Sequence, residues 1–430
     1  MRAPIELVVT GPRPLRGRLR VPGDKGISHR ALIAASLADG ESTIAHLAPG
    51  DDVARTRDAL VALGVDMVGE EATLSVTGRG YDAFRAPAAD LDCGNSGTTM
   101  RMLAGLLAGR PFRSVLTGDD SLTARPMQRV IAPLRALGAD IDGSNAGEHA
   151  PLTIRGRSLV GTRVEVAVAS GQVKTALVLA GLQAAETTEI VEPAPSRDHT
   201  ERLFSALGAP LERIDERTTR VRAGAPRAFD ADVPGDPSSA AFFVVAATVT
   251  PGSALVLEDV ALNPGRIAFI EILRAMGAEI SVMPRSERLG EPVGNIEVRA
   301  AHLHGTSFAC TEPIIDEVPV LAIAAAFAEG TTEIRNAAEL RVKESNRIAT
   351  IEEELTQLGV GVEGTPDGML VRGGRPHAGT FTSHGDHRIA MAAAVAANAT
   401  EGESHVRGWD SVAISYPQFA HDLERLSVPA

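Results

Sequence analysis

The stretch Val21-Pro22-Gly23-Asp24-Lys25-Gly26-Ile27-Ser28-His29-Arg30 decides how the rest of the chain is interpreted. A strand-like run ends at Pro-Gly, a turn of small residues follows, and Ala31–Ala38 has the composition of a buried helix. Lys25 and Arg30 are therefore expected at or just inside a helix N-terminus, which can bind a phosphate or a carboxylate. They are equally consistent with solvated surface charges, and the P-loop pattern G-x-x-x-x-G-K-[ST] is absent.

The same arrangement recurs six times, about every 70 residues. In each copy a small or polar turn precedes an Ala-rich helix, and a Thr/Val/Ile strand follows it. A second helix, usually closed by Leu-Gly or Met-Gly, lies between successive copies. Units of this length are too long for a short-period solenoid, and six of them fit two domains of three. The copies begin at Lys25, Asn95, Ser170, Asp236, Asp316 and Gly385.

The first helix of each copy is apolar nearly all round, so we expect it to be buried. If the copies share one orientation, six helix N-termini converge on one region suited to anionic ligands. The predicted boundary lies at Phe229–Gly235, between copies three and four. The predicted domains are 22–234 and 1–21 plus 235–430, and the opening segment is expected to pair with the C-terminal half.

The composition indicates a globular protein with ample core: 430 residues, 44% hydrophobic and 23% charged. Aromatic residues make up only 3%, so the cores must consist of Ala, Val, Leu and Ile. The net charge of −13 argues against nucleic-acid and membrane-surface partners. Any cluster of Arg and Lys would therefore be a local exception that needs an explanation.

Two cysteines, Cys93 and Cys310, exclude a disulfide framework and a Cys-rich zinc site. We find no export signal and no uninterrupted apolar run of about 18 residues, so we expect a soluble cytoplasmic protein. We also expect a monomer. His384 and His387 form a close histidine pair, and its spacing is weak support for a metal site.

Further motifs fall at or near the starts of the copies. Together with Pro22–Arg30, and in the same order along the chain, they resemble the 5-enolpyruvylshikimate-3-phosphate (EPSP) synthase family of enolpyruvyl transferases. None of the motifs is specific alone, but the combination is, and it covers nearly the whole chain. The motifs are Asn95-Ser-Gly-Thr-Thr99, Thr123-Ala-Arg-Pro126, Ser170-Gly-Gln172, Ser196-Arg-Asp-His-Thr-Glu201, Arg341-Val-Lys-Glu-Ser-Asn-Arg347 and Gly385-Asp-His-Arg388.

The resemblance implies an α/β fold of two domains, an inverse barrel-like arrangement in which each domain contains three βαβαββ repeats. It implies transfer of the enolpyruvyl group of phosphoenolpyruvate to the 5-hydroxyl of shikimate 3-phosphate, with release of phosphate, in the shikimate pathway to chorismate and the aromatic amino acids. The family needs no metal or organic cofactor. We further expect the free protein to be open and to close when shikimate 3-phosphate bridges the two domains.

The resemblance also implies roles for individual residues. Two anionic substrates side by side require several fixed cations. Asp316 would accept the 5-hydroxyl proton, kept ionised by Lys343, while Glu344 and Lys25 would handle the other proton transfers. The residues implied to bind shikimate 3-phosphate are Lys25, Gly26, Arg30, Ser170, Gly171, Gln172, Arg197, Asp316 and Lys343. Those implied to bind phosphoenolpyruvate are Lys25, Gly97, Arg125, Gln172, Arg347 and Arg388.

Several of these residues have structural alternatives. Arg347 and Arg341 could be exposed helix charges, and Asp316, Ser170 and Asn95 could be plain N-caps. Asp386, His29 and His387 are expected to be structural. Arg101 could be a site cation or part of an internal ion pair, and Lys174 has no assigned role.

The chain departs from the family pattern in places. Gly26 replaces a Ser that would contact shikimate 3-phosphate, which should weaken binding by about 1 kcal/mol. Arg197 replaces the Tyr of one branch. For the inhibitor glyphosate the features conflict, because Ser196–Glu201 resembles the tolerant branch whereas Gly97 is typical of sensitive members.

Two other functions remain as alternatives. One is the related transferase that acts on UDP-N-acetylglucosamine, which usually has a Cys where this chain has Asp120. The other is a non-catalytic anion-binding repeat protein, which the combination of Lys25, Asp316 and Glu344 with three arginines disfavours.

Overall fold

The computed structural model describes residues 5–70, 72–311 and 314–428 and divides into two compact units. Unit 1 comprises Met1–Pro22, Pro234–Ser286 and Pro292–Ala430, and unit 2 comprises Gly23–Val233 and Glu287–Glu291. The predicted domains 1–21 plus 235–430 and 22–234 place 287–291 with the former, whereas these residues pack with unit 2. Parts of the predicted domains, at 1–4, 71, 312–313 and 429–430, lie outside the described residues.

Unit 2 contains three repeats, and the strand β14 completes the first of them. Its elements are α1 (Lys25–Leu37), β3 (Asp39–Ala45), α2 (Asp51–Ala62), β4 (Asp66–Glu70) and β5 (Thr73–Arg79); η1 (Tyr81–Ala83), β6 (Leu91–Asp92), α3 (Gly97–Ala108), β7 (Arg113–Thr117), α4 (Asp120–Thr123), α5 (Gln128–Ala136), β8 (Asp140–Gly143), α6 (Ser144–Gly147) and β9 (His149–Arg155); and β10 (Arg163–Glu165), α7 (Gly171–Gly181), β11 (Thr188–Val191), α8 (His199–Ala206), β12 (Leu211–Arg213), β13 (Thr218–Val221) and β14 (Asp230–Asp232).

Unit 1 also contains three repeats, and the strands β1 and β2 from the start of the chain belong to it. Its elements are β1 (Glu6–Gly11), β2 (Arg16–Leu19), α9 (Pro237–Val249), β15 (Ala254–Ala261), α10 (Ala268–Ala275), β16 (Glu279–Arg288) and β17 (Glu291–Arg299); β18 (Ser307–Ala309), α11 (Val318–Ala326), β19 (Thr331–Arg335), η3 (Ala338–Val342), α12 (Arg347–Gln357), β20 (Gly361–Thr365) and β21 (Gly368–Arg372); and β22 (Thr380–Thr382), α13 (His387–Ala399), β23 (Gly402–Arg407), η4 (Trp409–Ile414) and α14 (Phe419–Leu426).

Among the described residues, four of the six sheets share one strand topology. In the sheets β14-β3-β5-β4, β6-β7-β9-β8, β10-β11-β13-β12 and β18-β19-β21-β20, the first two strands are parallel and the other neighbours are antiparallel. A right-handed crossover helix between the two parallel strands is the usual way to connect them. The predicted βαβαββ repeat is therefore present.

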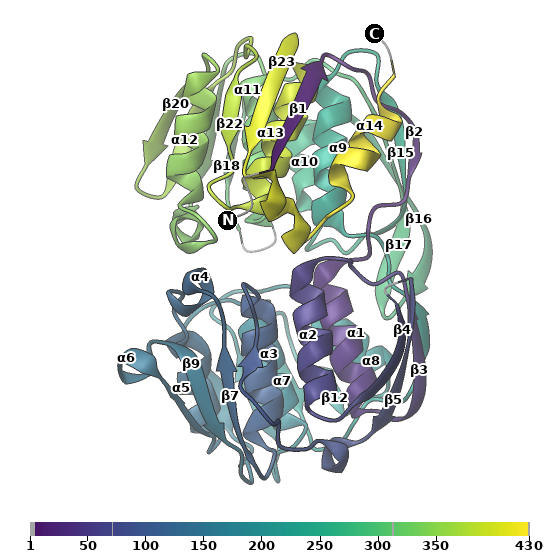
Figure 1. The fold of residues 1–430 in the computed structure, drawn as a ribbon, viewed down its shortest axis with the longest axis vertical. Helices are drawn as coiled ribbons and strands as arrows, with labels where there is room; N and C mark the ends of the chain where they lie inside the picture. Colours follow the sequence, from purple (N-terminus) through teal and green to yellow (C-terminus); the bar gives the residue numbers. More distant parts are fainter. Residues whose placement is uncertain (1–4, 71, 312–313, 429–430) are drawn as a thin grey trace. The chain divides into compact units, whose positions relative to one another are not determined.

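Three strands join sheets from a distance along the chain. β14 pairs in parallel with β3, β2 pairs in parallel with β15, and β1 pairs antiparallel with β23. Figure 1 shows β1 beside β23. The last repeat, which ends with α14, obtains a third strand in this way. The prediction that the opening segment pairs with the C-terminal half is confirmed.

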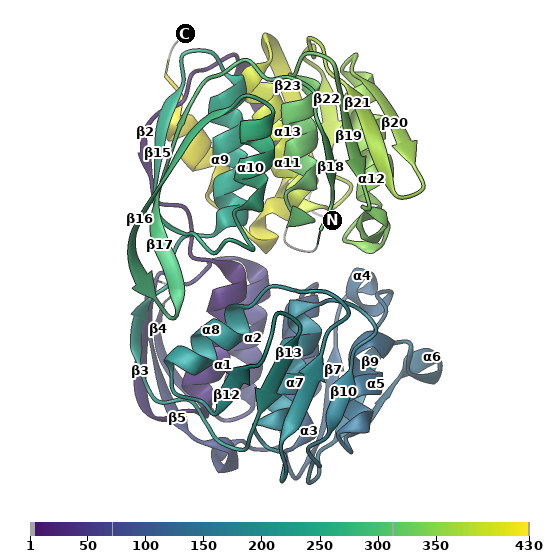
Figure 2. The same ribbon diagram turned by 180° about the vertical axis from the view of Figure 1, so that it is seen from behind.

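All six predicted Ala-rich helices are present as α1, α3, α7, α9, α11 and α13. The first of them begins at Lys25, which agrees with the expectation that Lys25 lies at or just inside a helix N-terminus, because Asp24 caps α1 and accepts a hydrogen bond from the Ile27 N–H at 2.8 Å. Figures 1 and 2 show α1, α3 and α7 side by side in unit 2. No helix within the described ranges has both the length and the apolar composition needed to cross a bilayer.

The cores agree with the composition. In α9, α11 and α13 nearly every residue is buried, and most of them are Ala or Val. Several aromatic side chains of unit 1 gather at one place, where Phe419 packs against Phe242, Phe243, Tyr416 and Trp409 with ring centroids 5.0 to 6.1 Å apart. Small residues elsewhere let the buried helices approach one another closely.

Gly105 is a tight point between α3 and α7, because a Cβ there would lie 2.0 Å from the Ala176 carbonyl oxygen. Gly105→Ala must push the two helices apart, and we expect it to lower the free energy of unfolding by about 2 kcal/mol. Gly374→Ala is the matched control, since nothing lies within 4 Å of its Cβ position. Thermal unfolding of both variants checks this; equal melting temperatures would contradict the close approach.

Candidate active site

In unit 2 the N-terminal turns of α1, α3 and α7 meet through side chains. Gln172 on α7 donates through Nε2 to Thr98 Oγ1 on α3 at 2.9 Å. Arg30 on α1 donates through Nη2 to the Gly171 carbonyl oxygen at 3.1 Å. The convergence expected from the repeats is therefore present among the three helices of this unit, and the helix dipoles add positive charge to the cations there.

Lys25 is the first residue of α1, and its Nζ lies 2.9 Å from Asp52 Oδ2 on α2. The lysine side chain is about one-fifth exposed. It is thus held at the helix N-terminus by a carboxylate while part of its surface remains accessible to a ligand.

Arg30 is 4% exposed and is held by four hydrogen bonds. It donates to Thr200 Oγ1 at 2.7 Å, Gly26 O at 2.9 Å, Thr175 Oγ1 at 2.8 Å and the Gly171 carbonyl noted above. Burial lowers the pKa of Arg30 to about 10, against the raising effects of Asp24 and Glu201, so the group is still cationic at neutral pH. It ties α1 to α7 and α8, and its predicted contact with a ligand stays a prediction.

Arg101 holds the predicted site residue Gln172. Its Nη1 donates to Gln172 Oε1 at 2.6 Å, so both ends of the Gln172 amide are fixed. Gly97 lies next to this contact, because a Cβ at Gly97 would be 2.8 Å from Arg101 Nη1 and 3.5 Å from Arg125 Nη1. The small residue at 97 therefore leaves room for both guanidinium groups.

Arg125 is held by Asn95, since its Nη2 donates to Asn95 Oδ1 at 2.5 Å and its Nη1 to Asn95 O at 3.3 Å. Asn95 is not an N-cap, because Ser96 caps α3. The helix after Arg125, α5, begins at Gln128, two residues after Pro126. Ser170 does cap α7, through a hydrogen bond of 3.4 Å from the Val173 N–H.

In unit 1 the N-terminal turns of α9, α11 and α13 likewise meet. Ser238 Oγ donates to Glu317 Oε1, which connects α9 with the N-cap residue of α11. Arg388 on α13 donates through Nη1 to the Asp316 carbonyl oxygen at 3.0 Å. Asp316 precedes the N-cap residue Glu317, so the alternative that Asp316 is itself an N-cap is wrong.

Arg347 is 1% exposed, so the alternative that it is a solvated helix charge is wrong. Its Nε lies 2.8 Å from Asp386 Oδ2 and its Nη2 lies 2.7 Å from Glu344 Oε2. Burial alone would lower the pKa of Arg347, but these two carboxylates raise it above its ordinary value. Its Nη1 is buried without a hydrogen-bond partner among the described residues, and it lies 3.6 Å from Asp316 Oδ1.

Asp386, which we expected to be structural, supports this half of the site. It is fully buried, caps α13 by accepting from the Arg388 N–H at 2.9 Å, and accepts from Ser345 Oγ at 3.1 Å. Burial acts to raise the pKa of Asp386, but the Arg347 guanidinium outweighs it and lowers the pKa below its usual range. One carboxylate thus orients the arginine and the helix N-terminus together.

Three cations surround the Asp316 carboxylate at somewhat longer distances. Lys343 Nζ lies 3.8 Å and Arg347 Nη1 3.6 Å from its Oδ1, and Arg388 Nη2 lies 3.7 Å from its Oδ2. The predicted residues Asp316, Lys343, Glu344, Arg347 and Arg388 are therefore brought together in unit 1.

Arg197 lies beside Gly171, because a Cβ at Gly171 would be 3.2 Å from the Arg197 carbonyl oxygen and 3.4 Å from its Cβ. Its charge also acts to lower the pKa of Arg30, which places two cations near the N-terminus of α7. The predicted residues Lys25, Gly26, Arg30, Ser170, Gly171, Gln172 and Arg197 are thus grouped around α1 and α7, with Gly97 and Arg125 at α3.

The two cysteines are buried thiols. Burial raises the pKa of both Cys93 and Cys310 to about 12, so each is protonated at neutral pH.

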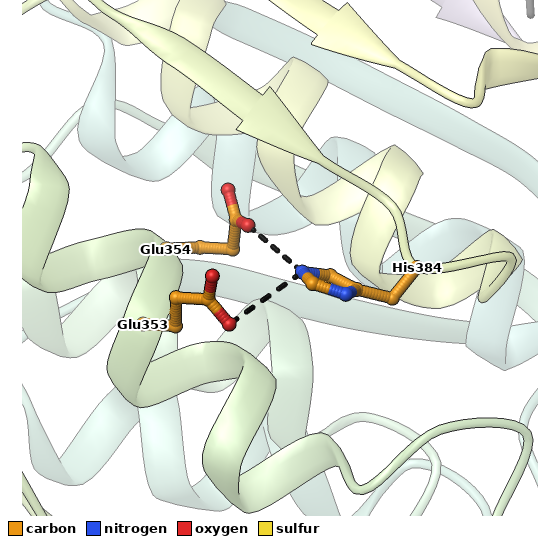
Figure 3. Close-up of side chains that lie close together, drawn as sticks. All are labelled: Glu353, Glu354 and His384. Atoms are coloured by element: carbon orange, nitrogen blue, oxygen red, sulfur yellow. Dashed lines mark hydrogen bonds and ion pairs between the residues drawn. The ribbon is translucent and has the colours of Figure 1, made fainter.

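The structure does not join His384 and His387 in one ligand set. Figure 3 shows His384 facing two glutamates of α12, with its Nε2 3.1 Å from Glu354 Oε1 and 3.8 Å from Glu353 Oε2. The other oxygen of Glu354 accepts from the Thr382 N–H at 2.8 Å. Burial raises the pKa of Glu354, against the lowering effects of Thr382 and His384. These contacts attach the turn before α13 to α12, which is a structural role.

Comparison with known proteins agrees with this geometry. The family model described as EPSP synthase (3-phosphoshikimate 1-carboxyvinyltransferase) matches residues 9–423. This chain belongs to the EPSP synthase family. A 3-phosphoshikimate 1-carboxyvinyltransferase of Synechococcus sp. strain JA-3-3Ab is 48% identical over 99% of this chain and 97% of its own length. One of Thermus thermophilus is 50% identical over 96% of this chain and 97% of its own length.

Solved structures show the fold of the EPSP synthase family as well. The EPSP synthase of Acinetobacter baumannii has a TM-score of 0.87 and 38% identity, and the match covers 98% of each chain. The enolpyruvyl transferase NikO of Streptomyces tendae has a TM-score of 0.80 at 18% identity over 99% of this chain and 100% of its own, which is a likeness of fold alone. The two-domain fold of repeated α/β units is confirmed.

Sequence reasoning about this EPSP synthase family member left two residues without a definite role. Arg101 holds Gln172, and Lys174 forms a buried ion-pair cluster. Asp386, which was expected to be structural, holds Arg347. The partners of Arg101 and Lys174 are on other elements, and no spacing in the sequence indicates them.

His29 gives a pH-dependent prediction. It is fully buried, its Nδ1 lies 2.7 Å from Thr56 Oγ1, and its Nε2 has no hydrogen-bond partner in the described ranges. Burial lowers the pKa of His29 from 6.5 to about 3. Between these values the unfolded chain binds a proton that the folded chain does not, so stability is lost as the pH falls below 6.5, by up to about 1.4 kcal/mol per pH unit.

We therefore expect His29→Asn to flatten the dependence of the free energy of unfolding on pH between roughly 7.5 and 5. Urea denaturation at several pH values measures it. Thr56→Val is the control: it removes the hydroxyl but keeps the buried imidazole, so it should destabilise the protein and leave the slope unchanged. A His29→Asn slope equal to that of the parent protein would contradict the assignment.

Proposed function

We propose that this protein transfers the enolpyruvyl group of phosphoenolpyruvate to the 5-hydroxyl of shikimate 3-phosphate and releases inorganic phosphate. The observation that carries the proposal is the match to the EPSP synthase family over residues 9–423. The clustered cations at helix N-termini in both units support it, because the two substrates carry phosphates and carboxylates.

The proposed reaction has two steps, and its atoms balance. First the 5-hydroxyl of shikimate 3-phosphate loses its proton, its oxygen bonds to C2 of phosphoenolpyruvate, and C3 gains a proton. The resulting tetrahedral intermediate then loses a proton from C3 and the C2–O bond to phosphate breaks. The vinyl ether is restored and inorganic phosphate leaves.

In this proposal Asp316 accepts the proton of the 5-hydroxyl. Lys343, Arg347 and Arg388 lie within 4 Å of its carboxylate, and such neighbours favour the charged form that a base must have. Glu344 and Lys25 are the groups assigned to proton transfer at C3 and at the leaving phosphate. Glu344 is fixed by Arg347 and Lys25 by Asp52.

The assigned phosphoenolpyruvate ligands are Arg125, Arg347 and Arg388 with Lys25, Gly97 and Gln172. The buried Arg347 Nη1 supports this role, since a donor without a hydrogen-bond partner favours an incoming anion. The residues assigned to shikimate 3-phosphate are Arg30, Ser170, Gly171, Gln172, Arg197 and Lys343. Gly26 replaces the usual Ser, so the hydroxyl of that Ser is absent here. We also propose that the enzyme is a cytoplasmic monomer and that glyphosate is a candidate inhibitor, for which the sequence features conflict.

The direct test measures phosphate release by the purified protein with phosphoenolpyruvate and one of two acceptors. We expect release with shikimate 3-phosphate and none with UDP-N-acetylglucosamine. Release only with the sugar nucleotide would replace the proposed acceptor with the alternative one, and release with neither would overturn the proposal. Adding glyphosate to the same assay tests whether it inhibits phosphate release.

Asp316→Asn separates catalysis from binding. The amide cannot accept the proton, so we expect kcat to fall by roughly 100-fold or more while calorimetry still detects shikimate 3-phosphate binding. Asp367→Asn is the control in the same unit, because Asp367 is an exposed loop residue that accepts from the Asn336 N–H. An Asp316→Asn variant with unchanged kcat would exclude Asp316 as the base.

A further inference from the structure

Lys174 is almost fully buried, although it is a lysine on the Ala-rich helix α7. Its side chain is 3% exposed, and its Nζ lies 2.8 Å from Glu192 Oε2 and 2.8 Å from Glu201 Oε1. The two glutamate side chains are 2% and 8% exposed. Burial alone would lower the pKa of Lys174, but the two carboxylates raise it, so the ammonium is charged throughout the neutral range.

The two carboxylates bracket one loop. Glu192 directly follows β11 and Glu201 lies in the first turn of α8, which begins at His199. The connecting residues 193–198 carry Arg197 and include Pro193 and Pro195. Lys174 therefore forms ion pairs at both ends of the loop that contains Arg197.

Lys174 itself lies close to the N-terminal turn of α7, so its ion pairs connect this helix end to the loop. Lys174 lies one turn after Ser170, and its N–H donates to the Ser170 carbonyl at 2.9 Å. Thr175, the next residue, and Thr200, next to Glu201, both accept from Arg30. The cluster thus lies directly behind the residues assigned to shikimate 3-phosphate, and the two glutamates in its ion pairs have no assigned ligand role.

We propose that Lys174 is a positioning residue that fixes the Arg197 loop against the N-terminus of α7, and so sets the affinity for the phosphorylated acceptor. The inference rests on the proposed function for its kinetic effect. A lysine is suited to this task because its ammonium can donate to two carboxylates from different elements at once.

The positioning role requires the positive charge of Lys174, because two buried carboxylates face it. Glu192 Oε1 and Glu201 Oε2 are buried without a hydrogen-bond partner among the described residues, and the Lys174 ammonium lies against the other oxygen of each carboxylate. Removing the ammonium leaves two buried negative charges that faced it, which is strongly unfavourable. The loop ends would then separate or take up water.

The test compares three variants of the full-length protein. Lys174→Met removes the ammonium at nearly constant volume. The triple variant Lys174→Met, Glu192→Gln, Glu201→Gln also removes the stranded charges, so it keeps the test valid if the single variant does not fold. Arg110→Met is the matched stability control, because Arg110 is a buried cation past the far end of α3 that donates to Gln183 and to the Tyr81 carbonyl.

The first readout needs no substrate. Hydrogen exchange of the Arg197 and Asp198 amides, together with tryptic cleavage after Arg197, reports how firmly the loop is held. We expect both to become roughly tenfold faster or more in Lys174→Met and in the triple variant, and to be unchanged in Arg110→Met. Unchanged loop exchange in the folded Lys174 variants would overturn the inference.

The second readout is steady-state kinetics. We expect KM for shikimate 3-phosphate to rise roughly tenfold or more in both Lys174 variants, with kcat changed less than about threefold and KM for phosphoenolpyruvate nearly constant. The triple variant should regain melting temperature but not KM, whereas Arg110→Met should lose melting temperature only. Recovery of KM together with stability in the triple variant would show that the lysine only neutralises charge and would overturn the inference.

The outcomes separate the two proposals. If the parent protein releases no phosphate with shikimate 3-phosphate, the proposed function fails, while the loop exchange still decides whether Lys174 fixes the Arg197 loop. If the parent protein is active and Lys174→Met has the parent KM, the function stands and the positioning role fails.

Discussion

The burial of three apolar helices side by side is the constraint on which each unit depends. Helices such as α9, α11 and α13 have almost no polar face, so their polar residues lie mainly at the ends. When such helices pack together, the N-terminal turns with their unpaired N–H groups come together as well. The anion-binding chemistry of each unit is therefore a consequence of how its core is built.

Buried carboxylates position the cations near these helix ends. Asp386 caps α13 and holds Arg347, and Glu192 and Glu201 hold Lys174 behind the first turn of α7. Burying a cation without such partners has a large desolvation cost in free energy. A buried cation that is fully paired with carboxylates stays in one position and can orient its neighbours. Among the cations that the proposal assigns to ligands, Lys25 is partly exposed and Arg347 has a donor to spare.

Much of the fold could be predicted because the repeat is written locally. Each Ala-rich helix and the glycines that close the second helices followed from composition and periodicity, and the structure confirms them. The expected pairing of the opening segment with the C-terminal half is also confirmed. The exact capping residues were left open. Ser96 caps α3 in place of Asn95, and Asp316 lies before its helix, because caps depend on a single hydrogen bond that propensity does not reveal.

The sequence by itself determined the family, the six repeats and the types of residue at each helix start, because these depend on residues close together in the chain. Only the tertiary structure decided which of those residues touch. Arg101 was ambiguous until its contact with Gln172 was seen, and Lys174 had no role until Glu192 and Glu201 met it from other elements. Such long-range contacts arise from packing, which brings together residues whose separation along the chain carries no pattern.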